Sequence, residues 1–170
     1  MKLIYFTLAF ISYFSVKSQD IAELARRNGF KDIKLGSPVD SVQGATFEKD
    51  IIELKEFEAK QYEVKNTAYE KIGEADVKSV ALKTYKGLIY EIKVITPKDP
   101  RIMKGLEKSY GKATYNIRTE TYNWQVPKQI SLTYRGHPKK EVTLVYRSYP
   151  VVKLMYADKK KKIEEIADDF

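Results

Sequence analysis

The chain has 170 residues, with 31 Lys and Arg against 23 Asp and Glu, a formal net charge of +8, one histidine and no cysteine. The absence of cysteine excludes a disulfide framework, thiolate chemistry, a cysteine-based zinc site and lipid attachment at an N-terminal cysteine. The excess of positive charge suits an anionic counterpart, such as lipid headgroups or an acidic protein surface.

The N-terminus has the pattern of a secretory signal peptide. Lys2 provides a positive start, residues 3–11 form an apolar run, and Val16 and Ser18 suit positions −3 and −1 of a cleavage site. The run is too short to span a hydrocarbon core of ~30 Å. We therefore expect removal of residues 1–18, which leaves residues 19–170 as one domain in the periplasm or outside the cell. The alternative is an N-terminal anchor helix that stays uncleaved.

Two short helices are expected in the first part of the domain. Residues 20–29 predict a helix, with Asp20 as its N-cap and Gly29 in the left-handed conformation that ends it. A brief extended piece over residues 30–36 leads to a second helix, which Ser37 caps and Pro38 begins. Residues 44–76 are ambiguous, with strand pieces near residues 45–47 and 61–64.

Strand signals dominate from residue 77 onward. Residues 80–85 and 88–95 predict a hairpin around Lys86 and Gly87. A helix follows, capped by Asp99 and ended by Gly111, and residues 151–156 are expected to form a last strand. Between this helix and residues 151–156, the sequence predicts three strands in which apolar and polar residues alternate. Their apolar residues predict the core face: Tyr122, Trp124, Val126, Ile130, Leu132, Tyr134, Val142, Leu144 and Tyr146.

The residues that alternate with these apolar positions point to the other side of the three strands and predict a flat polar face. Its members are Thr121, Asn123, Gln125, Ser131, Thr133, Arg135, Thr143 and Arg147. Such a face is able to hydrogen-bond a protein or a glycan. The tyrosines and Trp124 have two interpretations, because aromatic residues suit both interfaces and the core beneath the helices.

Residues 158–170 predict a C-terminal helix. Ile163, Ile166 and Phe170 share one stripe with Ala167, and the charges of the helix oppose its macrodipole. We therefore expect the helix to be ordered by docking this stripe on the body of the domain. The basic run Lys159, Lys160, Lys161 and Lys162 predicts a solvated helix face or a weak contact with anionic headgroups.

Three segments resemble a known family. Residues 30–42 resemble the pattern F-x-x-I-x-L-G-x-S/T-x-x-x-V of small bacterial envelope proteins, and residues 106–114 resemble a helix end L-x-x-x-Y-G-K-P-T. A run of antiparallel strands then starts at residues 122–124. Together they are similar to the β-lactamase-inhibitor-protein-like (BLIP-like) group, although Ala113 stands where the family usually has Pro. The resemblance implies helices on one face of an antiparallel sheet, and a binding role.

Catalytic and metal motifs are weak. His137 is the only histidine and lies in a predicted turn, while Glu53, Glu56 and Glu58 have the pattern of a solvated charged face. No phosphate loop, nucleophile motif or metal-ligand spacing is present, so no cofactor or metal is expected. The residues predicted to bind a partner are Arg135, Arg147, Asn123, Thr133, Arg118 and His137.

Arg135 and Arg147 are the expected anchors of this surface, because they lie on neighbouring strands and an arginine binds carboxylates or phosphates through two donors.

The sequence as a whole predicts an α+β domain, an antiparallel sheet packed on one face by short helices and followed by a C-terminal helix. The predicted function is a non-catalytic binding module of the cell envelope with a protein or glycan partner. The alternative is an envelope hydrolase that acts on cell-wall or glycan material through carboxylates. No nucleic-acid partner is expected.

Overall fold

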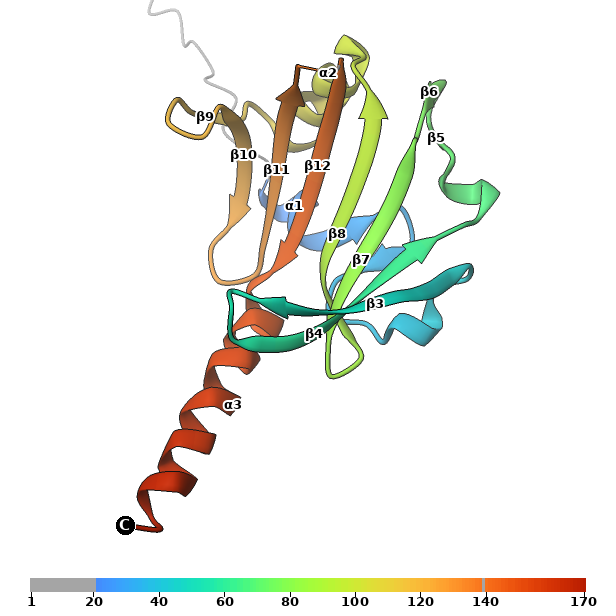
Figure 1. The fold of residues 1–170 in the computed structure, drawn as a ribbon. Coiled ribbons are helices and arrows are strands. Elements are labelled where there is room, and N and C mark those ends of the chain that lie inside the picture. The colour runs from blue at the N-terminus through green and yellow to red at the C-terminus, as the bar shows by residue number, and fades with distance from the viewer. Residues whose placement is uncertain (1–20, 139) are drawn as a thin grey trace, which may run out of the picture.

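The computed structural model describes residues 21–138 and 140–170. The predicted signal peptide, residues 1–18, and the expected cap Asp20 lie outside the described residues. An eight-stranded antiparallel sheet forms the body, in the order β3-β4-β7-β8-β12-β11-β10-β9 (Figure 1). Its strands are β3 (Ala45–Glu53), β4 (Phe57–Val64), β7 (Ser79–Tyr85), β8 (Leu88–Pro97), β9 (Thr114–Asn116), β10 (Thr121–Val126), β11 (Ile130–His137) and β12 (Glu141–Ser148).

The remaining elements are three α-helices, two short hairpins and two 3₁₀ turns in the described part of the chain. They are α1 (Ile21–Arg27), β1 (Gly29–Phe30), β2 (Ile33–Lys34), η1 (Val39–Ser41), η2 (Thr67–Tyr69), β5 (Lys71–Ile72), β6 (Ala75–Asp76), α2 (Pro100–Tyr110) and α3 (Tyr149–Ala167). In Figure 1, α1 and α2 lie behind the sheet, and α3 extends away from its lower end. The predicted α+β class, with a C-terminal helix, is confirmed.

The main core lies on the side of the sheet covered by α1 and α2. Trp124, Leu132 and Leu144 come from three neighbouring strands and are at most 1% exposed. The indole Nε1 of Trp124 donates to the carbonyl oxygen of Gly111 at 2.7 Å, so its polar atom is satisfied inside the core. Gly111 ends α2 with a φ of 73°, a conformation that L-residues rarely adopt.

Two other element boundaries lie where local sequence signals predict them. The carboxylate of Asp99 accepts from the backbone N–H of Arg101 at 2.8 Å and caps α2. Lys86 and Gly87 have φ values of 50° and 78°, which suit the tight turn of the β7–β8 hairpin. The strand pieces at residues 45–47 and 61–64 belong to a longer hairpin, β3–β4.

The start of the domain differs from prediction at two turns. Asn28, with a φ of 44°, takes the left-handed conformation after α1, and Gly29 already belongs to β1. Asparagine tolerates this conformation because its short polar side chain bonds locally, here to the carbonyl oxygen of Leu35 at 2.9 Å. The expected helix at residues 37–40 is only the 3₁₀ turn η1, and its cap position, Pro38, has no side-chain acceptor.

The expected strand over residues 151–156 is wrong, because this segment is the start of α3. The hydroxyl of Ser148 accepts from the N–H of Val151 at 3.4 Å, and Pro150 occupies the first turn, as is typical of a helix N-terminus. Val151 and Met155 are one helical turn apart and are 5% and 1% exposed. They form a second, smaller core with residues of β4 and β8: Phe57, Ala59 and Tyr90.

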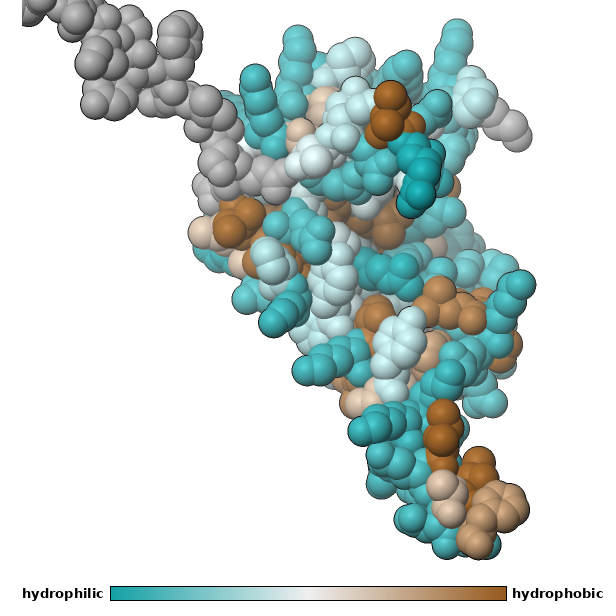
Figure 2. All heavy atoms as spheres, turned by 90° about the vertical axis from the view of Figure 1, so that its left-hand side faces the viewer, coloured by the Kyte–Doolittle hydropathy of each residue, from teal (hydrophilic) through white to brown (hydrophobic). Residues whose placement is uncertain are grey.

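The expected docking of the C-terminal stripe is also wrong. Ile163, Ile166 and Phe170 are 54%, 61% and 105% exposed, and Figure 2 shows apolar side chains gathered at the protruding tip of the helix. Because α3 begins at Tyr149, the lysine run lies in the middle of the helix and not at its positive end. The first turns of α3, and not its C-terminal stripe, therefore pack against the body of the domain.

Within residues 21–138 and 140–170, no helix combines the length and apolarity needed to cross a membrane.

Candidate functional site

The face of the sheet opposite α1 and α2 is hollowed. The start of α3 borders the hollow at one end, and strands β8, β12 and β11 form its floor. Its volume is about 710 Å³, and we call it the open hollow. It is lined by Leu54, Glu91, Lys93, Ser131, Thr133, Arg135, His137, Thr143, Val145, Arg147, Tyr149, Val152 and Tyr156.

Strand alternation brings most of the predicted polar face to this hollow. Ser131, Thr133 and Arg135 of β11 point to the same side as Thr143 and Arg147 of β12. The remaining predicted members line an adjoining depression toward β9, which shares Thr133 and Arg135 with the hollow: Thr121, Asn123 and Gln125. The predicted face therefore exists, but it is concave where a flat surface was expected.

The two arginines do not project together. In the β11–β12 register, Arg135 lies opposite Thr143, whereas Arg147 lies opposite Ser131. The offset corresponds to about 13 Å along the strands, at ~3.3 Å per residue. Arg135 is exposed and makes no ion pair with any residue that the structure describes. Arg147 is instead bound to Glu53, with 3.2 Å between its Nη2 and Oε1 of the glutamate.

Glu53 is the centre of a charged cluster at the border of the hollow. Its Oε2 accepts from Nζ of Lys83 at 2.9 Å and from the hydroxyl of Tyr90 at 2.8 Å. Nζ of Lys83 also lies 3.3 Å from Oε1 of Glu91. The side chain of Glu53 is 12% exposed, so its prediction as part of a solvated face is wrong. The sequence signal for this position is Ile51, which shares a side of β3 with Glu53 and is also half-buried.

The ionisation of this cluster follows from its contacts. Burial by itself raises the pKa of Glu53, but the hydrogen bonds from Lys83 and Tyr90 and the charge of Arg147 outweigh it, so that the pKa is lowered. Burial, followed by the bond to Glu53, raises the pKa of Tyr90. Glu53 is therefore an anion at neutral pH, and Tyr90 stays a hydrogen-bond donor.

Sequence reasoning missed a cation and an aromatic rim in the open hollow. Lys93 of β8 is exposed and forms no ion pair within the described part of the chain. Leu54, Tyr149 and Tyr156 are 52%, 36% and 50% exposed where α3 and the β3–β4 turn border the hollow. Tyr156 was missed because residues 151–156 were assigned to a strand, and Tyr149 lies before that predicted strand.

The other predicted partner-binding residues are more dispersed. His137 Nε2 lies 3.0 Å from Oγ1 of Thr143 at the end of β11, and it lines the hollow. Asn123 accepts from the hydroxyl of Thr133 at 3.0 Å, so their polar groups are partly used within the sheet. Arg118 is exposed in the turn before β10 and lines neither depression.

The basic run of α3 is largely paired. Lys159 contacts Glu56 at 2.5 Å, and Lys160 and Lys161 contact Glu164 and Glu165 one turn along the helix. Pairs as exposed as the last two contribute little to stability. The headgroup contact of these lysines stays a prediction.

Residues 21–138 and 140–170 contain no group of three or more His, Asp and Glu that could hold a metal ion. Comparisons of the chain with family models, with curated proteins and with solved structures found no match. The assignment of function therefore depends on the geometry of the site itself.

Proposed function

We propose that this chain is an exported, non-catalytic binding module of the bacterial cell envelope, and that the open hollow binds an acidic segment of a partner protein. The observation that carries the proposal is the pair of cations in the hollow, Arg135 and Lys93. Both are exposed, and neither has an ion-pair partner among the described residues.

The shape and chemistry of the hollow favour a protein segment. The guanidinium of Arg135 is free to bind a carboxylate through two parallel hydrogen bonds. Tyr149 and Tyr156 add exposed aromatic area at the end of the hollow that α3 borders, and such residues are enriched at the centres of protein interfaces. Arg147 has a different role, because it balances Glu53 and so keeps the border of the hollow in place.

Export supports an envelope setting for this binding role. The pattern of residues 1–18 predicts secretion, and the resemblance to the BLIP-like group implies a binding module. Both stay predictions. An acidic partner also agrees with the net positive charge of the chain.

An envelope hydrolase acting through carboxylates is the alternative function. A glycosidase of that kind needs one carboxyl group whose pKa is raised, so that it serves as a general acid. Glu53 and Glu91 do approach one another through Lys83, but Glu53 does not line the open hollow, and Lys83, Tyr90 and Arg147 engage both of its carboxylate oxygens. A carboxylate held in this way is poorly placed to act on a substrate in the hollow, and we therefore favour binding over catalysis.

The proposal is tested by capture of the partner from an envelope extract on the immobilised protein. Replacing Arg135 and Lys93 with Ala is expected to reduce the captured partner strongly. The control replaces Lys104 and Lys108 with Ala, which removes the same charge from exposed positions of α2. Equal capture by both double variants contradicts the proposal.

A further inference from the structure

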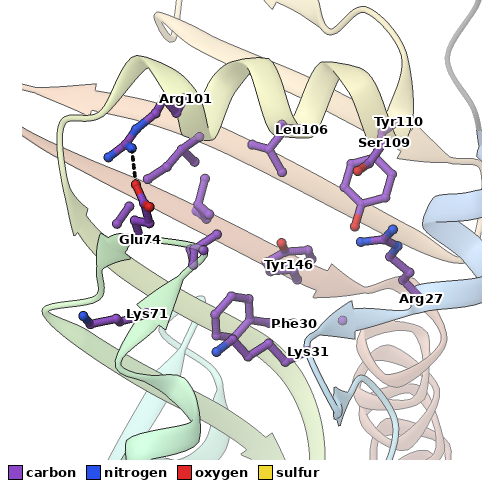
Figure 3. Close-up of a pocket in the computed structure, with 17 residues that line it drawn as sticks. Arg27, Phe30, Lys31, Lys71, Glu74, Arg101, Leu106, Ser109, Tyr110 and Tyr146 are labelled. Carbon is purple, nitrogen blue, oxygen red and sulfur yellow. Dashed lines mark hydrogen bonds and ion pairs between the residues drawn. The ribbon is translucent and has the colours of Figure 1, made fainter.

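A second cavity lies on the other side of the sheet, between α2 and the short hairpins β1–β2 and β5–β6 (Figure 3). Its volume is about 700 Å³, which falls in the range of small-molecule sites, roughly 300–1,000 Å³. We call it the helix-side pocket. Its interior is mainly apolar, with Phe30, Ile72, Leu106 and Leu144 among the lining residues.

A glycine inside α2 keeps this pocket open. The lining residues of α2 are Arg101, Ile102, Gly105, Leu106, Ser109 and Tyr110, a spacing that forms one stripe of the helix. Gly105 lies in the middle of that stripe. A Cβ atom at this position meets nothing within 4 Å, so packing does not require a glycine. Glycine in a helix interior lowers stability relative to alanine, and here its one structural consequence is open space in the pocket.

The pocket also contains a tyrosine hydroxyl with an unused hydrogen-bonding capacity. Tyr146 of β12 is 4% exposed and lies in the middle of the lining residues in Figure 3. It makes no hydrogen bond to any residue that the structure describes. Burial raises the pKa of Tyr146, so its hydroxyl stays protonated and remains a donor at neutral pH. The hydroxyl is not sealed from solvent, so it is able to donate to an acceptor that enters the pocket.

The charge at the edges of the pocket is positive at the end formed by α1, next to Tyr110. Arg27 of α1 lies on that side, with its guanidinium carbon 5.7 Å from the ring centroid of Tyr110 (Figure 3). Its Nε is bonded to Glu23 at 2.5 Å, but Arg26 pairs with the same carboxylate, so two arginines share one negative charge. At the other end, Arg101 is paired with two carboxylates, Glu74 at 2.8 Å and Asp99 at 2.8 Å, which balance Arg101 and the neighbouring Lys71. An anionic group is therefore best placed between Arg27 and Tyr146.

We propose that the helix-side pocket binds a small amphipathic carboxylic acid, with its carboxylate between the Tyr146 hydroxyl and Arg27 and its apolar body beneath α2 beside Gly105. The apolar lining accounts for the body of the ligand, and the donor and the cation account for its head group. This site is separate from the open hollow and does not depend on the function proposed there.

The probe for this site is decanoate, titrated into the purified protein by calorimetry, with decanol as the uncharged comparison. We expect saturable binding of decanoate with a Kd below about 1 mM. Decanol is expected to bind less tightly. No saturation by decanoate overturns the proposal, and equal affinity for decanol overturns the assignment of the carboxylate position.

Substitutions at two lining residues test where the ligand binds in the pocket. Gly105→Leu fills the pocket and is expected to weaken decanoate binding about tenfold or more, while Glu107→Leu adds the same side chain at an exposed position of α2 and leaves it unchanged. Tyr146→Phe removes only the hydroxyl and is expected to weaken binding about fivefold. Unchanged affinity in Gly105→Leu overturns the proposal. Because this variant removes a helix glycine, its melting temperature is expected not to fall, which separates loss of binding from loss of folding.

Discussion

The two faces of the eight-stranded sheet use the same strands for different purposes. On the side of α1 and α2, Trp124, Leu132 and Leu144 are buried in the main core. On the other side, their sequence neighbours Gln125 and Thr133 line polar depressions. Because side chains alternate along a strand, one short sequence supplies both a scaffold and a surface. The comparison predicts that mutations one residue apart have very different consequences.

The largest expected effect separates two adjacent residues of β10. Trp124→Ala removes a side chain that is 1% exposed and is expected to lower the free energy of unfolding by about 3–5 kcal/mol. Gln125→Ala, on the opposite face, is expected to change it by about 0.5 kcal/mol or less. Urea unfolding of both variants measures the difference. Similar losses in the two variants contradict the assignment of the faces.

The second comparison is between the two ends of α3. Met155→Ala is expected to cost about 2–5 kcal/mol, because Met155 is 1% exposed in the smaller core. Removing residues 163–170, whose apolar side chains are exposed, is expected to cost less than about 1 kcal/mol. Thermal unfolding followed by circular dichroism compares them. A large loss on truncation contradicts the exposed position of the tail.

Glu53→Gln tests the charged cluster at the border of the open hollow. Removing the charge leaves Lys83 and Arg147 less well compensated, at an expected cost of about 2 kcal/mol near pH 7. The pKa of Glu53 is lowered from 4.5, so its stabilisation is complete above about pH 4.5 and is lost as the pH falls through the lowered value.

Unfolding measured from pH 7 down to acid is therefore expected to show convergence of wild type and Glu53→Gln at low pH. A stability difference between the two proteins that is independent of pH contradicts this role of the glutamate.

The smallest effects distinguish the two arginines. Arg135→Ala is expected to change the free energy of unfolding by about 0.5 kcal/mol or less, because the structure gives this side chain no ion pair among the described residues. Arg147→Ala is expected to cost about 1 kcal/mol, because it withdraws a partner from Glu53. Equal stability of the two variants by urea unfolding argues against a structural role for Arg147.

The parts of the fold that the sequence predicted are those with local signals. The α2 boundaries follow from Asp99, Pro100 and Gly111, and the alternation of β10, β11 and β12 identifies their buried residues. Tyr122 is the exception, since it is 38% exposed and contacts Tyr115 with tilted rings whose centroids are 4.8 Å apart. Its strand lies next to the short edge strand β9, so little of the sheet covers it.

The errors lie where tertiary contacts decide. Residues 151–156 are an apolar run with one lysine, which suits a buried strand as well as a helix, but Pro150, the cap Ser148 and the burial of Met155 in the smaller core favour the helix. The open hollow needed pairings between distant parts of the chain, such as Glu53 with Arg147, which no local pattern reveals. For the same reason the sequence placed the two arginines on one face without giving their separation.

Site-specific photo-crosslinking in intact cells tests the proposed binding face most directly. A photoreactive residue at Thr133 lies in the open hollow, whereas one at Lys104 lies on the exposed side of α2. We expect one discrete adduct from position 133 that weakens when Arg135 is also replaced by Ala, and none from position 104. An equal adduct from both positions, or an adduct from position 104 alone, contradicts the proposal that the open hollow is the binding surface.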